Sequence, residues 1–264
     1  MKINTLNLVY FSATYTTKKI VENIAKHFEA ETSTVYDITQ TPLQEELVCK
    51  DNDLLIIGVP VYYGRIADTA LSSIRHLKGN NTPAVIVCVY GNRDYDDALL
   101  ELKDMTEENG FKIISAGAFI ARHCIFSDVA TNRPDEKDMQ VIESFGERTA
   151  ELLTDIQSTN AIQKISVKGN HPYKTYTHNP NPISTNDDCT LCGTCAELCP
   201  TQSIDADNPK ETNYTSCISC GRCIIVCPEN ARAFSGTAYE ATKPKFTAAF
   251  SRRNEPELIY ASLD

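Results

Sequence analysis

CTLCGTCAELCP (residues 189–200) and CISCGRCIIVCP (217–228) each read C-x2-C-x2-C-x3-C-P, so the same cysteine spacing occurs twice in the second half of the chain. Together they hold eight of the eleven cysteines in 264 residues. Disulfide scaffolds also use many cysteines, but they are typically small secreted chains, whereas this chain is larger and shows no export signal. The crowding therefore indicates metal ligation.

Four thiolates at these spacings can surround a compact metal cluster. In this ligand run the fourth cysteine binds the other of two [4Fe–4S] clusters. The rule predicts a first cysteine set and a second cysteine set, one for each cluster. The first set is Cys189, Cys192, Cys195 and Cys227, and the second set is Cys217, Cys220, Cys223 and Cys199. Two zinc sites are the alternative, but a zinc ribbon uses two separated CxxC pairs, which is a different pattern.

The double run also resembles the bacterial two-cluster ferredoxins over residues 186–235, with every ligand position matched. The resemblance implies one-electron transfer.

The first 160 residues alternate between strand and helix patterns. Strands are expected at 4–11, 33–38, 53–61, 83–91 and 112–121, and helices at 16–29, 67–78, 94–109 and 135–158. Several strands are continuous runs of Val, Ile and Leu, which indicates burial on both faces of a parallel sheet. The sequence therefore predicts an α/β fold with a doubly wound five-stranded sheet.

Composition divides the chain into four parts. Residues 1–158 form the α/β domain, and 159–186 are rich in Asn, Thr and Pro, which is typical of a connecting segment. Residues 187–235 form the cysteine-rich domain, for which the resemblance to ferredoxins implies an α+β fold. Residues 236–264 show little periodicity and are expected to form a tail that packs on the domains.

The turn FSATYTTKK (11–19) lies between the first strand and the first helix, where N–H groups and the helix dipole favour a phosphate. Its hydroxyl residues are Ser12, Thr14, Thr16 and Thr17. A turn of this composition can also simply cap the helix. Its form S-x-T-x-x-T resembles the flavodoxin phosphate loop, and this resemblance implies FMN. Ala13 and Tyr15 depart from that loop, because flavodoxins often have a small residue or glycine at these positions.

Ligands of open α/β sheets bind at the carboxyl ends of the strands. The third and fourth strands end in VPVYYGRI (59–66) and VYGNRDYDDAL (89–99), which offer rings, glycines and polar groups to a flavin ring. The candidates there are Pro60, Tyr62, Tyr63, Gly64, Tyr90, Gly91, Asn92, Arg93 and Tyr95. Weak catalytic candidates are Arg65, Arg93 and His123, and weak interface candidates are His171 and Tyr173. Tyrosines that line a sheet edge and solvated arginines are the structural alternative.

Taken together, these motifs and the segments RPDEKD (133–138) and GNHPYK (169–174) resemble the flavodoxin–ferredoxin fusion proteins of anaerobic bacteria and archaea, the EFR-type ferredoxins. The resemblance covers nearly the whole chain. It implies a flavodoxin-like domain with strand order 2-1-3-4-5 and FMN, joined to a ferredoxin domain with two [4Fe–4S] clusters.

The net charge of −10 argues against nucleic acid, and no apolar run is long enough to insert in a membrane, so we expect a cytoplasmic protein. The acidic charge favours redox protein partners with complementary charge. Three functions stay open: an FMN and iron–sulfur oxidoreductase with a small-molecule electron acceptor, an electron carrier between larger redox proteins, and a phosphate-binding protein with structural clusters.

Overall fold

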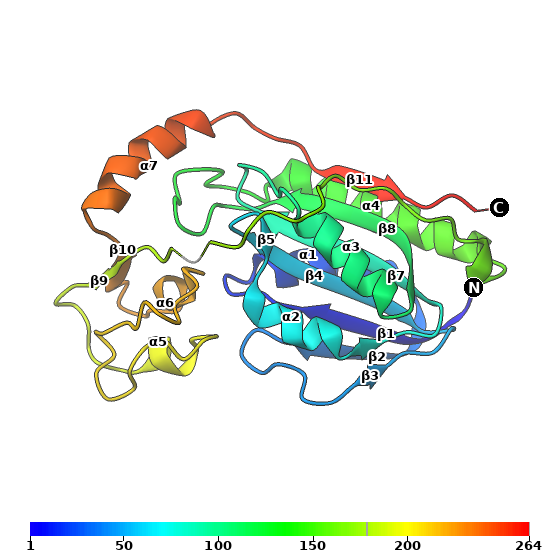
Figure 1. Cartoon of the computed structure of the whole chain (residues 1–264), viewed down its shortest axis with the longest axis horizontal. Coiled ribbons are helices and arrows are strands. Elements are labelled where there is room, and N and C mark those ends of the chain that lie inside the picture. Colours follow the sequence, from blue (N-terminus) through cyan, green and yellow to red (C-terminus); the bar gives the residue numbers. More distant parts are fainter. Residues whose placement is uncertain (178, 264) are drawn as a thin grey trace.

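The computed structural model describes residues 1–177 and 179–263 and contains a large sheet-centred unit and a smaller, loop-rich unit beside one end of the sheet (Figure 1). Residue 178 of the expected connecting segment and residue 264 of the tail lie outside the described residues.

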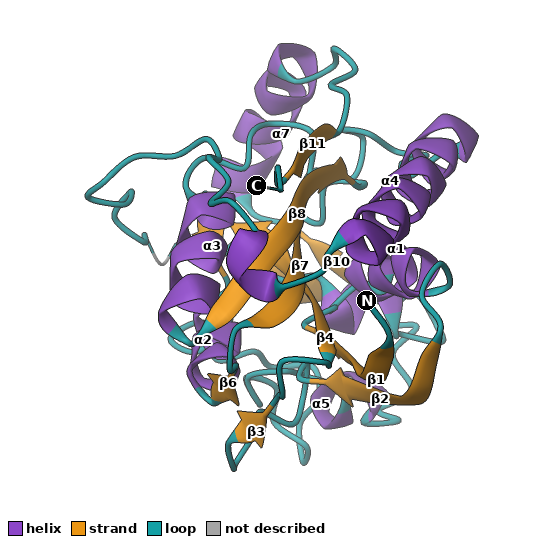
Figure 2. Cartoon of the chain, turned by 90° about the vertical axis from the view of Figure 1, so that its right-hand side faces the viewer, coloured by secondary structure: helices purple, strands orange, loops and turns teal. Residues whose placement is uncertain are grey.

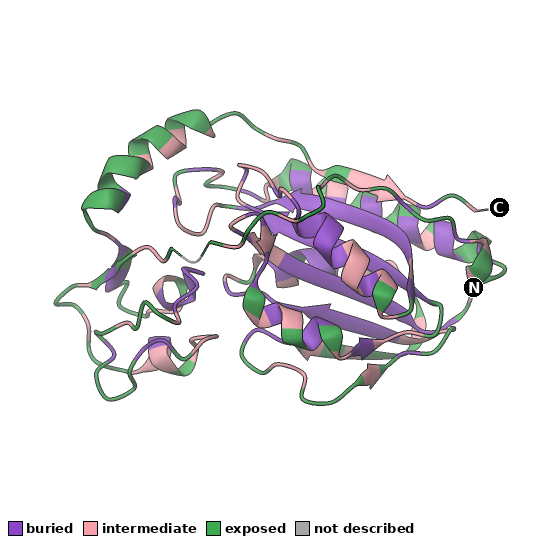
Figure 3. Cartoon of the chain, viewed as in Figure 1, coloured by how far each residue is buried: buried purple, intermediate pink, exposed green. Residues whose placement is uncertain are grey.

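The large unit is built on parallel strands. They are β1 (Ile3–Tyr10), β2 (Ala30–Asp37), β4 (Leu54–Tyr62), β7 (Thr82–Tyr90) and β8 (Phe111–Ile120). Their order is β2-β1-β4-β7-β8, and β11 (Glu257–Tyr260) adds an antiparallel strand beside β8. The fully buried residues of β4 and β7 form the centre of the core (Figure 3). The doubly wound α/β fold predicted from the sequence is confirmed.

Helices cover both faces of the sheet. Helices α1 (Thr16–Ala25) and α4 (Glu136–Asp155) lie together on one face, and α2 (Asp68–Arg75) and α3 (Ala98–Glu108) lie on the other (Figure 2). The short strands β3 (Leu47–Val48), β5 (Arg65–Ile66) and β6 (Leu77–Lys78) were not expected, because two residues are too few to form a pattern.

The smaller unit contains little regular structure. Strand β9 (Ile183–Thr185) pairs with β10 (Arg232–Phe234), and helices α5 (Thr194–Glu197) and α6 (Arg222–Ile225) each span one turn. A short 3₁₀ turn, η1 (Thr159–Ala161), follows α4. Because β9 lies inside the segment expected to be a connector, the smaller unit begins at or before Ile183 rather than at residue 187.

The tail has more structure than its sequence suggested. Helix α7 (Thr237–Ala249) contains Pro244 and buries only Tyr239, so it lacks the apolar periodicity that identifies most surface helices. The chain then returns to the sheet as β11 (Figure 1).

Throughout the two described ranges, every helix is too short or too polar to cross a lipid bilayer.

The start of α4 depends on a buried ion pair. Arg133 donates two hydrogen bonds to Asp138, whose side chain is 2% exposed. Asp138 and Asp135 also form a capping box, in which each side chain accepts the backbone N–H of the other. Arg253 of the tail donates to both carboxylates. The Asp138 carboxylate therefore connects the helix start, the preceding loop and the tail.

Replacing Asp138 with Ala should lower the free energy of unfolding by about 3–5 kcal/mol, because it leaves the buried Arg133 without its counter-charge. The adjacent exposed Lys137 is the control, and Lys137→Ala should change stability by no more than about 0.5 kcal/mol. Urea unfolding followed by far-ultraviolet circular dichroism measures both. Equal midpoints for the two variants would contradict this account of the helix start.

Candidate functional site

The first cysteine set surrounds a common space. Its four cysteines line one small cavity, together with Pro209, Pro228 and Arg232. Cys227 comes from the second run, so the crossing between runs predicted from the sequence is present in the geometry. Within residues 1–177 and 179–263, no three His, Cys, Asp or Glu side chains stand close enough to hold a single metal ion.

The second cysteine set is more deeply buried. Burial raises the pKa of the Cys217, Cys220 and Cys223 thiols. The charge of the nearby Cys199 thiolate also raises the pKa of each of these thiols. Cys199 therefore lies with the run that is not its own. Both sets have the soft sulfur donors that an iron–sulfur cluster requires.

Arg232 lies between the cysteine sets. The residue is 2% exposed, its Nη1 donates to Cys195 Sγ at 3.6 Å and to the Pro209 carbonyl, and its Nε has no partner in the described structure. The charge of Arg232 also lowers the pKa of Cys217 and Cys223, against the larger effect of burial. A buried cation next to both sets suits anionic clusters.

The loop after β1 has the geometry of an anion site. Tyr15 precedes α1 in the left-handed conformation, with φ at 64°, and offers no side-chain hydrogen bond to the first N–H groups of the helix. Ser12 Oγ accepts from Lys18 N at 3.0 Å, so Ser12 braces the loop from inside. Thr14 and Thr16 line a cavity, here called the loop cavity, whereas Ser12 and Thr17 are buried and do not line it.

A second cavity, here called the ring cavity, lies at the carboxyl ends of β4 and β7. It has a volume of about 340 Å³ and mostly apolar walls. Of the residues predicted for a flavin ring, it is lined by Tyr62, Tyr63, Gly64, Tyr90, Gly91 and Arg93. His123, Cys124 and Ile125 line both the ring cavity and the loop cavity, so the two adjoin. A ring space beside the start of a helix fits FMN.

Other walls of the ring cavity come from parts of the chain that the sequence did not connect to it. They are Lys174, Thr177, Asn179 and Asn181 of the connecting segment, Ile218 and Ser219 of the second cysteine run, and Phe126 and Phe246. Ile218 and Ser219 stand between Cys217 and Cys220. No local signal identifies these residues, because only the packing of the smaller unit places them there.

His123 has a fixed protonation state. Its Nδ1 accepts from the N–H groups of Ile125 and Phe126 at 3.2 and 3.1 Å, which leaves the proton on Nε2. Burial, and after it the charge of Arg93, lowers the pKa of His123 to about 4. Gly91 packs against it so closely that a Cβ there would lie 2.6 Å from His123 Cδ2. His123 is thus a neutral side chain held at the cavity wall.

Three predicted residues have other partners. Asn92 donates to the carbonyls of Phe250 and Arg252 and accepts from Asn254 N, so it anchors the tail instead of meeting a ring. Tyr95 donates to Glu257 of β11. Arg65 is tied to Glu101, at 2.5 and 2.8 Å, and does not line the ring cavity.

The remaining candidates also lie outside the ring cavity. Pro60 belongs to β4 without lining the cavity. His171 and Tyr173 both bond to Asp104 of α3, at 2.7 and 2.5 Å, and so hold the connecting segment on the large unit.

Comparisons with known proteins agree with this geometry. A family model described as "Flavodoxin domain" matches residues 7–112, and one described as "4Fe-4S dicluster domain" matches residues 170–232. No curated protein matches the chain.

Solved structures match part of the chain. An archaeal flavodoxin is 17% identical and covers 57% of this chain and 99% of its own, with a TM-score of 0.40. The apo form of an NADH:FMN oxidoreductase, EMOB, is 15% identical over 59% of this chain and 93% of its own, with a TM-score of 0.45. A flavodoxin of Streptococcus pneumonia TIGR4 is 18% identical and covers 58% of this chain and 99% of its own, with a TM-score of 0.41. These likenesses concern the fold alone.

The two domains define an electron-transfer protein of the flavin and iron–sulfur class, with FMN and an iron–sulfur cluster as its cofactors. The chain is a flavodoxin–ferredoxin fusion, with the flavodoxin domain first and the 4Fe–4S dicluster domain second.

The neutral state of His123 predicts an acid-sensitive stability. An unfolded histidine has a pKa of about 6.5, so between that pH and about 4 the unfolded chain binds a proton that the folded chain does not. Stability should therefore fall as the pH is lowered through this window. His123→Gln should show a smaller loss between pH 7.5 and 5 in urea unfolding. Identical pH profiles for the two proteins would show that His123 is not held neutral.

Proposed function

We propose that this chain transfers electrons between two [4Fe–4S] clusters and FMN within one molecule, and so couples one-electron donors to a flavin oxidoreductase site. When bound, each cluster exchanges one electron and FMN one or two, which lets one-electron donors supply two-electron chemistry. The eight cysteines of the two sets are the proposed cluster ligands. Thr14, Thr16 and the N–H groups at the start of α1 are the proposed phosphate contacts.

One observation carries the proposal: the ring cavity is lined by both domains. Ile218 and Ser219, from between two cysteines of the second set, face the same space as Tyr63 and Tyr90 of the flavodoxin domain. The chain is thus arranged to hold the second cysteine set beside the proposed flavin site. Fusion also replaces diffusional encounter with an effective concentration on the order of millimolar.

Specific side chains maintain this arrangement. Asn181 N donates to Ser219 Oγ at 2.8 Å, and Tyr63 donates to the Asn179 carbonyl at 2.9 Å, so the connecting segment joins the two walls of the cavity. Phe126 and Phe246 stack with ring centroids 4.3 Å apart and exclude water from one side. Arg93 and Lys174 also line the cavity, where both pair with Asp96.

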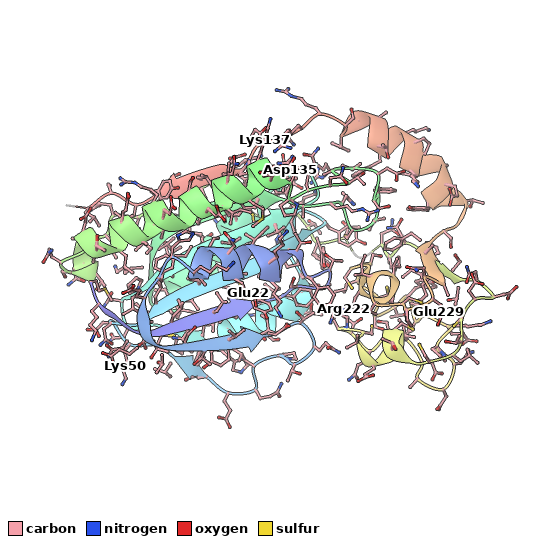
Figure 4. The ribbon with its side chains drawn as sticks, turned by 180° about the vertical axis from the view of Figure 1, so that it is seen from behind. Glu22, Lys50, Asp135, Lys137, Arg222 and Glu229 are labelled. Carbon is pink, nitrogen blue, oxygen red and sulfur yellow. The ribbon has the colours of Figure 1, made fainter. Side chains whose placement is uncertain are left out.

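An electron carrier without a small-molecule substrate is the second candidate. The observation that favours it is the acidic surface beside the first cysteine set, where Asp187, Asp188 and Glu229 are exposed. Such a surface would steer redox proteins with basic docking faces toward this end of the molecule. Figure 4 shows Glu229 on the side of the dicluster domain that is remote from the sheet.

Iron and acid-released flavin on anaerobically purified protein test the proposal, which predicts about eight irons and one FMN per chain. Flavin that never binds, even after reconstitution with FMN, would contradict it.

The crossed ligand sets predict a specific pattern of cluster loss. Cys227→Ser and Cys199→Ser should each lower the iron content toward half, and their electron paramagnetic resonance spectra should lose different clusters. Cys192→Ser should lose the same cluster as Cys227→Ser, although the two residues lie in different runs. The control is Cys88→Ala, a fully buried cysteine of β7 outside both sets, which should keep all the iron. Matching losses in Cys199→Ser and Cys192→Ser would overturn the crossed assignment.

Replacing Arg232 with Met should lower the midpoint potential of the cluster held by the first set. The change removes a hydrogen bond to Cys195 sulfur and a buried positive charge, both of which favour the reduced, more negative cluster. Lys210→Met removes one charge at an exposed position of the same domain and should have a smaller effect. Redox titration monitored by electron paramagnetic resonance measures both, and equal potentials in all three proteins would contradict the role of Arg232.

A further inference from the structure

Arg222 connects the dicluster domain to the loop after β1. It lies in α6 between Cys220 and Cys223, and its Nη1 donates to the carbonyls of Ala13 and Ser12 at 3.0 and 3.5 Å. Its guanidinium also lies over the ring of Tyr15, 4.4 Å from the centroid. Figure 4 shows Arg222 at the junction of the two domains.

The surroundings of Arg222 do not balance its charge. The residue is 7% exposed, and its Nε is buried without a partner. Among the described residues, no Asp or Glu lies within ion-pair distance of the guanidinium. A buried cation is normally paired, because burying an isolated charge is costly. Arg222 therefore indicates an anion at this junction.

The loop that Arg222 touches is the proposed phosphate loop. The Ser12 carbonyl and the Ala13 N–H belong to one peptide unit, and the Ala13 carbonyl and the Thr14 N–H belong to the next. A cation at the carbonyl end polarises each peptide and makes its N–H a stronger donor. Thr14 lines the loop cavity, and the side chain of Tyr15 makes no hydrogen bond to the start of α1.

We propose that Arg222 is a positioning residue for FMN, holding and polarising the phosphate loop from the dicluster domain. The FMN phosphate supplies the negative charge that Arg222 otherwise lacks. Affinity for FMN then depends on the folded dicluster domain, although the flavodoxin domain supplies the loop. The inference rests on the proposed function, since it concerns the same flavin.

The test compares FMN with riboflavin, which has the same ring and no phosphate. Flavin-free protein with intact clusters is titrated with each compound by equilibrium dialysis. Arg222→Met should weaken FMN binding roughly ten- to hundredfold, the range expected for hydrogen bonds that involve a charged group. Riboflavin binding should change less than about twofold, and Arg222→Lys should restore part of the FMN affinity.

Two further variants keep the test decisive. Arg148→Met removes one charge from an exposed position of α4 and should leave both affinities unchanged. Tyr15→Leu removes the stacking ring from the flavodoxin side, so it tests the same contact if Arg222→Met loses its clusters. Tyr15→Leu should weaken the binding of FMN more than that of riboflavin. The loss of FMN affinity should be smaller when Tyr15→Leu is added to Arg222→Met than when it is made in the wild-type protein.

The outcomes separate the two proposals. Wild-type protein that binds neither flavin would overturn the proposed function. Wild-type protein that binds FMN, with Arg222→Met binding it equally well or losing both flavins alike, would overturn the role of Arg222 alone. A change confined to cluster potentials would assign the charge of Arg222 to the second cysteine set and would also overturn this inference.

Discussion

The contact between the second cysteine run and the carboxyl edge of the sheet determines how the rest of the molecule is arranged. The run reaches the loop after β1 through Arg222 and the ring cavity through Ile218 and Ser219. A parallel sheet gathers its strand ends at one edge, so a single small domain can touch several of them at once. The proposed flavin site and the second cysteine set are adjacent because the dicluster domain covers that edge.

Two segments hold the dicluster domain in this position. The connecting segment is fixed to α3 by Asp97, which accepts hydrogen bonds from the N–H groups of Asn170 and Lys174 at 2.8 and 2.6 Å. The tail returns to the large unit through Asn92 and β11. Because the chain is anchored on both sides of the dicluster domain, separating the domains requires the loss of hydrogen bonds at two distant places.

The sequence predicted what depends on local pattern. Long apolar strands and cysteine spacings are determined within a few residues, so the sheet and both cysteine sets could be predicted. The partners of Asn92 lie about 160 positions away, and its loop composition suited a flavin equally well. Helix α7 was missed because it packs by a few rings rather than along an apolar face. No sequence pattern identified Arg222 either, because only the docking of the two domains shows that its charge is unpaired.

The choice between an oxidoreductase and a carrier depends on α7. Phe246 of this helix packs on His123 and Phe126, with ring centroids 4.9 and 4.3 Å away, and forms one wall of the ring cavity. The rest of the helix is mostly exposed (Figure 3). An element with few buried contacts opens at a lower free-energy cost than the core around it. The other walls belong to strand ends, the cysteine run and the connecting segment, and the connecting segment is hydrogen-bonded to Tyr63 and Ser219. By this comparison, α7 is the wall whose movement would admit a small molecule. A protein that reduces a substrate at the flavin therefore needs α7 to open, whereas a carrier works with α7 closed.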